Sequence, residues 1–213
     1  MFIPNIPNSD FPGSWFYKYI FCNFLNRKLN IRYNADTDTV QIYYDGAWVD
    51  WKAGNMQTVY LYDNGDECTD VTGGWSVSTA NSSNGTASVT KRSDKMTLYA
   101  PYVGGASSAG SGQAVAFTTN PITITKGTLR AKANGYTAMI FYATSKPVAK
   151  APESTTSMFA PTNAVQIGTI PMSDDALKSF DVSNLIGKTV YLGIAICGLG
   201  TGRSTDFTYM DLI

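Results

Sequence analysis

From residue 57 to residue 213, short apolar stretches alternate with residues that form turns. Each stretch is rich in Val, Ile, Thr or Tyr and is bounded by Gly, Asn, Asp or Pro, which is typical of strands joined by tight turns. We expect strands near residues 57–62, 74–79, 86–91, 95–100, 113–118, 121–125, 127–133, 136–143, 164–170, 177–182, 188–197 and 205–213. No stretch has the pattern of a three-turn helix; a short helix at residues 174–179, capped by Ser173, is the one alternative. The pattern predicts an all-β sandwich.

The clearest local signal is the segment TVQIYYDGAWVDWK at residues 39–52. Asp45-Gly46 is a preferred pair for a two-residue hairpin turn, because a type I′ turn needs positive φ at both positions. The expected cross-strand pairs are Tyr44 with Ala47, Tyr43 with Trp48, Ile42 with Val49, Gln41 with Asp50, and Val40 with Trp51. An isolated hairpin is marginally stable in water, so we expect it to be an appendage that docks on something else.

These patterns divide the chain into an N-terminal attachment segment, residues 1–54, and a β-sandwich of the jelly-roll type, residues 55–213. Within the sandwich, residues 190–197 are apolar on both faces, as a central strand would be. At the N-terminus, the apolar run 15–25 is interrupted by Lys18 and followed by its basic residues, so it resembles neither a signal peptide nor a membrane span. We expect this aromatic segment to pack on the domain, on a neighbouring subunit or on a partner.

Composition narrows the function further. The 213 residues include 16 basic and 16 acidic side chains, so the net charge is zero, which argues against nucleic-acid binding. The absence of histidine excludes His-based catalytic triads and His-bearing zinc sites within this chain. The three cysteines, Cys22, Cys68 and Cys197, form no CxxC pair and are expected to be reduced thiols. We therefore expect no cofactor.

Two connections are long enough to be functional, although each also fits a tolerated surface loop. Residues 104–112 form a Gly/Ser-rich stretch, and residues 144–163 form a polar connection with three prolines.

Two further segments carry a resemblance to a known family. They are VYLYDNGDECTDVTGGW at 59–75, and LKSFDVSNLIGKTVYLGIAICG at 177–198 followed by the closing strand DFTYMDLI. Together they resemble the C-terminal jelly-roll modules of structural proteins from bacteriophages and prophages of Gram-positive, often gut-dwelling, bacteria. The hairpin YDGAWVDW at 44–51 looks like the short element that often precedes that module, so the resemblance covers about residues 36–213. The pattern DVSNLIGKTVYLGI also resembles galactose-binding-like carbohydrate modules.

Carbohydrate modules of similar fold often hold a structural calcium near the chain ends. In this sequence that resemblance points to the carboxylates of Asp66, Glu67, Asp70 and Asp211, because calcium takes several oxygen ligands at once. The alternative is ordinary turn chemistry, in which Asp and Asn side chains bond to their own backbone. No loop has EF-hand spacing, and we assign no metal site.

The resemblance implies a virion structural protein, assembled in the host cytoplasm and most readily placed in the tail tip as a receptor-binding component. Its expected partners are other virion proteins and copies of itself, with a trimer favoured, and it is not expected to enter a membrane. A head-decoration protein would have the same sequence features.

A glycan-binding module is the alternative. Trp75, Tyr99, Tyr102 and Tyr136 lie beside Gly or Pro turns and could stack on sugar rings, for example on a host surface glycan. Each could equally be a core or rim aromatic of a sandwich.

The third hypothesis is a polysaccharide-cleaving enzyme, which would need two carboxylates across a cleft. Most carboxylates here stand in turn contexts, such as Asp36, Asp38, Asp45 and Asp63, and no catalytic group can be named. We therefore expect a non-enzymatic protein.

Overall fold

The computed structural model describes residues 31–34, 39–44, 47–51, 58–82, 85–101, 112–150, 158–198 and 202–213. The chain divides into two compact units, Met1–Gly54 and Asn55–Ile213. Several sequence expectations lie outside the described residues: the aromatic segment 1–30, the Asp45-Gly46 turn and residues 104–111 of the Gly/Ser-rich loop.

The described part of the first unit is a three-stranded antiparallel sheet of β1 (Ile31–Asn34), β2 (Thr39–Tyr44) and β3 (Ala47–Trp51). The register of β2 and β3 is the one expected, from Tyr44 opposite Ala47 to Val40 opposite Trp51, so the predicted pairing of the two strands is confirmed. Strand β1 was not expected from the sequence. It pairs with β2 and gives the hairpin a third strand, which an isolated two-stranded hairpin lacks.

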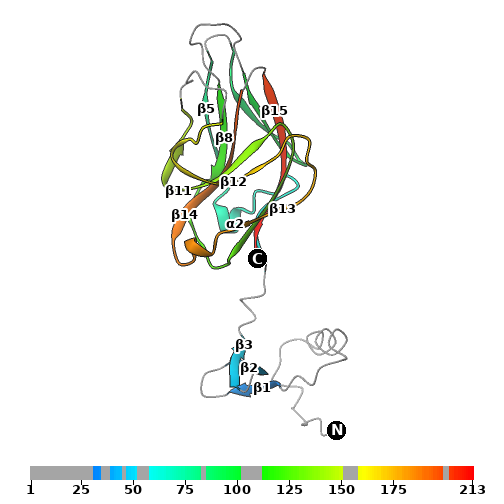
Figure 1. The fold of residues 1–213 in the computed structure, drawn as a ribbon, viewed down its shortest axis with the longest axis vertical. Helices are drawn as coiled ribbons and strands as arrows, with labels where there is room; N and C mark the ends of the chain where they lie inside the picture. The colour runs from blue at the N-terminus through cyan, green and yellow to red at the C-terminus, as the bar shows by residue number, and fades with distance from the viewer. Residues whose placement is uncertain are drawn as a thin grey trace. The chain divides into compact units, whose positions relative to one another are not determined.

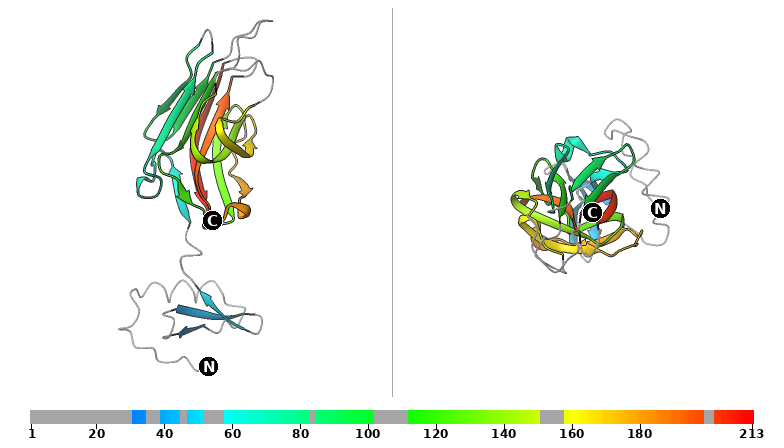
Figure 2. Two further views of the ribbon diagram at one scale, coloured as in Figure 1. Left: turned by 90° about the vertical axis from the view of Figure 1, so that its left-hand side faces the viewer. Right: turned by 90° about the horizontal axis from the view of Figure 1, so that it is seen from above.

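The second unit is a jelly-roll β-sandwich of two antiparallel six-stranded sheets (Figures 1 and 2). Sheet I has the order β13-β10-β15-β7-β6, with β4 also paired to β15. It contains β4 (Val59–Asp63), β6 (Ser88–Lys91), β7 (Met96–Ala100), β10 (Thr128–Gly135), β13 (Lys178–Asp181) and β15 (Arg203–Leu212). Sheet II has the order β12-β11-β14-β8-β5, with β9 paired to β14. It contains β5 (Trp75–Ala80), β8 (Gln113–Thr118), β9 (Ile122–Thr123), β11 (Ala138–Val148), β12 (Thr162–Ile170) and β14 (Thr189–Cys197).

The all-β prediction is confirmed, and each expected strand of the sandwich overlaps an observed one. The apolar strand β14 lies in the middle of sheet II, as its sequence predicts. The helix considered at residues 174–179 is wrong, because Ser173 has a positive φ of 59° and strand β13 begins at Lys178. The described helices are instead one turn, α2 (Thr69–Thr72), and a 3-10 turn, η2 (Ser183–Leu185). In the described residues, no helix has the length and apolar character needed to cross a bilayer.

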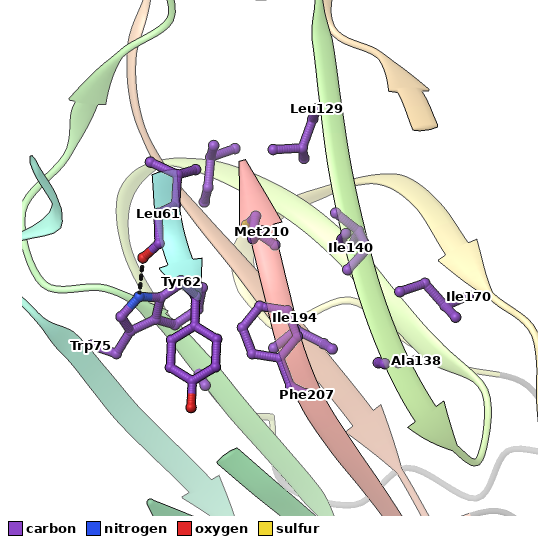
Figure 3. Packing of buried hydrophobic residues seen from close by; sticks show 14 of the residues in the cluster. Leu61, Tyr62, Trp75, Leu129, Ala138, Ile140, Ile170, Ile194, Phe207 and Met210 are labelled. Atoms are coloured by element: carbon purple, nitrogen blue, oxygen red, sulfur yellow. Dashed lines mark hydrogen bonds between the residues drawn. The ribbon is translucent and has the colours of Figure 1, made fainter. Parts of the chain in front are cut away.

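The core between the sheets is centred on three aromatic rings from different strands (Figure 3). Tyr62 of β4 stacks on Phe207 of β15 with ring centroids 4.9 Å apart, and Trp75 of β5 lies 5.3 Å from Phe207. The indole Nε1 of Trp75 donates a 2.8 Å hydrogen bond to the carbonyl of Leu61, so its polar atom is satisfied inside the core. Burial, with the charges of Glu67 and Asp94, raises the pKa of Tyr62 to about 12. These rings join the two sheets.

The outer face of sheet II is covered by the chain itself. An apolar cluster lies on it, made of Val115, Phe117, Met139, Phe141 and Ala195. Described residues of the connection between β11 and β12, among them Ala149, Met158 and Ala160, pack on that cluster. The polar connection expected at 144–163 is therefore partly a covering segment, and its residues 151–157 lie outside the described residues.

Candidate ligand-binding face

The described residues leave the outer face of sheet I uncovered, and its side chains are polar and aromatic. Directly opposed residues on paired antiparallel strands share a face, so the register identifies the residues that point outward. They are Tyr60 and Asp63 of β4, Ser88 and Thr90 of β6, Thr97 and Tyr99 of β7, Thr128, Arg130, Lys132 and Asn134 of β10, Ser179 and Asp181 of β13, and Ser204, Asp206, Tyr209 and Asp211 of β15. We call this set the sheet I face.

A hydrogen-bonded network lies at the centre of the sheet I face. The carboxylate of Asp211 is fully buried and accepts hydrogen bonds from three donors on two adjacent strands. The Nε of Arg130 donates to Oδ1 at 2.9 Å, its Nη2 donates to Oδ2, and the Tyr209 hydroxyl donates to Oδ2 at 2.5 Å. A buried carboxylate is tolerated when it is paired and hydrogen-bonded in this way. The network therefore fixes the positions of Arg130 and Tyr209 on the face.

The hydrogen bonds to Asp211 also shift the pKa values of Arg130 and Tyr209. The hydrogen bond to Asp211 is the largest influence on Arg130 and raises the pKa of its guanidinium, which stays charged. Burial raises the pKa of Tyr209, and the bond to Asp211 raises it further, so its hydroxyl keeps its proton. Arg130 therefore stays a cation across the physiological pH range, and Tyr209 stays a neutral phenol whose one proton goes to Asp211 and whose oxygen can still accept a hydrogen bond.

An exposed ring lies beside this network. Tyr60 is 46% exposed and packs edge-to-face on Tyr209, with centroids 6.1 Å apart and planes at 87°. Such a contact fixes the orientation of the Tyr60 ring. The face therefore combines an oriented aromatic surface with adjacent donors and acceptors.

A second polar and aromatic group lies farther along β15. Asp206 accepts hydrogen bonds from Lys95 Nζ at 2.8 Å and from the hydroxyl of Thr97 at 2.7 Å. Tyr99, which is 39% exposed, lies opposite Ser204. Tyr60 lies opposite Asp211, so at a rise of about 3.3 Å per residue the two tyrosines are roughly 20 Å apart along β15.

The structure separates the four aromatics suggested by the sequence. Tyr99 lies on the sheet I face, whereas Trp75 is 3% exposed and belongs to the core, so its ring has no solvent-facing surface on which a sugar could stack. Tyr136 lies at the turn between β10 and β11, with the guanidinium carbon of Arg203 4.6 Å from its ring centroid. Tyr102 lies outside the described residues. The four therefore do not form one platform.

The carboxylates considered for calcium also have separate roles. Asp66 Oδ1 accepts from the Cys68 backbone N–H at 2.9 Å, which is turn chemistry. Glu67 pairs with Lys91 at 2.7 Å and accepts from the Trp75 backbone N–H at 2.7 Å, while Asp211 belongs to the Arg130 network. Asp70 is exposed on α2. Among the described residues, no group of three or more His, Cys, Asp or Glu is placed to hold a metal ion.

The chain was also compared with known proteins. No family model matches the chain, and no curated protein matches it. Among solved structures, it is similar to a family 29 carbohydrate-binding module from Piromyces equi, with 9% identity, 73% of this chain and 89% of that chain covered, and a TM-score of 0.41.

Two further solved structures show a similar fold. A mutant of the module CBM29-2, complexed with cellulohexaose, has 12% identity, with 74% of this chain and 92% of that chain covered and a TM-score of 0.41. A cleaved adhesin domain of Lys-gingipain from Porphyromonas gingivalis has 11% identity, with 74% and 98% covered and a TM-score of 0.36. At this level of similarity, the matches assign no family and locate no site.

Proposed function

We propose that the sandwich unit is a glycan-binding module without catalytic activity, and that the glycan lies on the sheet I face. The observation that carries the proposal is the exposed ring of Tyr60, held edge-on by Tyr209 next to the Arg130–Asp211 pair. A sugar ring has apolar C–H surfaces and a rim of hydroxyls. It therefore needs an aromatic surface together with a few fixed polar groups.

Preorganisation supports the same conclusion. Binding costs free energy when side chains must be ordered, and that cost is lower when their positions are already fixed. The Tyr209 hydroxyl and the Arg130 guanidinium are fixed by a buried carboxylate. Asp206, the partly exposed carboxylate of the face, accepts hydrogen bonds from Lys95 and Thr97, which fix its position for bonding a sugar hydroxyl.

The test is a glycan array followed by titration calorimetry with the bound sugar. We expect Tyr60→Ala to weaken binding at least about tenfold, because tenfold corresponds to about 1.4 kcal/mol, the scale of one aromatic contact. Tyr191→Ala is the matched control. Tyr191 makes the same kind of edge-to-face contact, with Phe117 at 6.1 Å, but lies on sheet II. Equal affinity of the wild-type protein and the Tyr60 variant would refute the proposed face, and silence on the array would refute glycan binding.

The phage resemblance of residues 36–213 supports a particular setting for this module, a receptor-binding component of a virion tail tip. In that setting, residues 1–54 attach the chain to other virion proteins or join it into a trimer, and the sandwich binds a host surface glycan. The setting requires that removing residues 1–54 abolish assembly without abolishing glycan binding.

A further inference from the structure

The cations of the sheet I face are paired with carboxylates. Lys95 pairs with Asp206 at 2.8 Å, Arg130 pairs with Asp211, and Lys132 pairs with Asp175 at 3.3 Å. Arg130 and Lys132 lie on β10, and Lys95 immediately precedes β7. Their partners lie on β15 and in the loop after β12. Each cation is therefore neutralised locally.

The remaining charged residues of the face do not give it an excess of positive charge. Asp63 lies opposite Tyr209 and accepts from the Asn64 side chain, and Asp181 lies opposite Thr128 and accepts from the Ser183 backbone. Arg92 lies at the turn between β6 and β7, and its positive charge helps to lower the pKa of Asp206. In the described part of the chain, the cations of this face therefore do not outnumber its carboxylates.

We infer that the ligand is an uncharged, linear polysaccharide, and that acidic polymers of sugar phosphates or uronic acids are excluded. This inference rests on the glycan-binding function proposed above. An anionic chain would have to compete with the buried carboxylate of Asp211 for Arg130, and leaving a buried charge without its partner is costly. The partly exposed Lys95–Asp206 and Lys132–Asp175 pairs oppose an anionic ligand more weakly, because solvent and salt screen them. Sugar hydroxyls avoid this cost, because the accessible carboxylates of Asp206 and Asp175 each have about four lone-pair sites and can accept further bonds while they stay paired.

The spacing of the exposed rings indicates an extended ligand. Tyr60 and Tyr99 lie roughly 20 Å apart along β15, and the polar groups of Tyr209 and Asp206 lie between them. A monosaccharide can contact only one end of this strip. A linear oligosaccharide parallel to β15 can contact both rings, so affinity is expected to rise with chain length.

The experiment uses the full chain with two sets of probes, neutral hexasaccharides of glucose or mannose and hexamers of galacturonic acid or glycerol phosphate. Titrations at about 50 mM and about 500 mM NaCl separate charge–charge contributions to the binding free energy, which salt screens, from contributions that do not depend on salt. We expect a neutral hexamer to bind with less than about a twofold change between the two salt concentrations, and the anionic hexamers to bind at least about tenfold more weakly.

A charge variant sharpens the test. Asp175 is 66% exposed, so Asp175→Asn should leave the fold intact while releasing Lys132. We expect this variant to gain affinity for the anionic hexamers at low salt, whereas Asp70→Asn, an equal charge change on exposed α2, should not.

The outcomes are distinguishable. Preferential binding of an anionic hexamer that weakens with salt and depends on Tyr60 would overturn this inference and leave the glycan-binding function standing. Failure of every hexamer to bind would overturn this inference, and silence on the glycan array as well would overturn the glycan-binding function itself.

Discussion

Gln113 shows how one buried amide can hold a long connection on the surface of a sheet. Its Oε1 accepts from the Lys150 backbone N–H, and its Nε2 donates to the Phe159 carbonyl, both at 2.8 Å. These two partners lie on either side of residues 151–157, so a single side chain at the start of β8 fixes both ends of the segment. The Phe159 carbonyl also accepts from the thiol of Cys197 at 3.6 Å.

Substitution of Gln113 by Leu should therefore destabilise the fold, although Leu has a side chain of similar size. We expect Gln113→Leu to lower the free energy of unfolding by about 2 kcal/mol, because the Lys150 N–H loses its partner and the Phe159 carbonyl keeps only the weak bond from the Cys197 thiol. Urea denaturation measures this change. Gln166→Leu on β12 is the control, since Gln166 is exposed and its loss should change stability by less than about 0.5 kcal/mol. Equal effects of the two substitutions would show that Gln113 does not hold the connection.

A single residue also explains why the sequence did not predict the aromatic side chains of the sheet I face. Tyr60 and Tyr62 are two residues apart, so regular alternation would place both rings on one side of β4. The register with β15 shifts between Met210 and Asp211, which makes Leu61 an extra residue, and the two rings then point to opposite faces. A β-bulge of this kind depends on the partner strand. The sequence pattern suggested Tyr99 but could not suggest Tyr60 or Tyr209.

At the scale of elements, β15 organises sheet I. It pairs with β10 along one edge, and with β7 and then β4 along the other. The first and last strands of the sandwich, β4 and β15, thus lie side by side. Strand positions could be predicted because apolar alternation and turn residues are local signals. The pairing of β15 with three partners is a long-range property, and so are the ion pairs that it creates on the sheet I face.

One of those pairs predicts a pH dependence. Burial opposes ionisation of Asp206, but the bonds from Lys95 and Thr97 and the charges of Lys95 and Arg92 outweigh it and hold its pKa below the ordinary value of 3.8. A carboxyl with a lowered pKa stabilises the fold above that ordinary value, and the contribution is lost as the pH falls through the folded pKa. Asp206→Asn should therefore reduce stability at neutral pH, by less than about 1 kcal/mol because the pair is partly exposed and screened.

Urea unfolding of the wild-type protein and the Asp206 variant at several pH values measures this effect. The difference between them should shrink as the pH falls from about 4 towards 2. Asp70→Asn, on exposed α2, is the control and should show a smaller difference at neutral pH. A difference that grows on acidification would contradict the assigned sign.

At the scale of the whole molecule, the two outer faces of the sandwich differ in kind. Sheet II is closed by the connection between β11 and β12 over an apolar cluster, whereas the face of sheet I carries ion pairs and exposed tyrosines. The outer face of sheet II therefore contributes to stability by burial, and the outer face of sheet I is the one for which we propose a role in recognition. The separate compact unit before Asn55 adds a third part, to which the sequence resemblance assigns attachment.

If residues 1–54 attach the chain and residues 55–213 bind the glycan, a chain that lacks residues 1–54 should fold and bind but not assemble. The core of the sandwich comes from residues beyond Asn55, so residues 55–213 should fold cooperatively without the first unit. We expect the full chain to sediment as a trimer and residues 55–213 as a monomer with unchanged affinity for a soluble hexasaccharide. Binding to a glycan-coated surface should weaken by about a hundredfold or more, because linked sites gain from effective concentration. A full chain that sediments as a monomer would contradict the attachment role of residues 1–54, whereas loss of hexasaccharide binding on truncation would move the site away from the sheet I face.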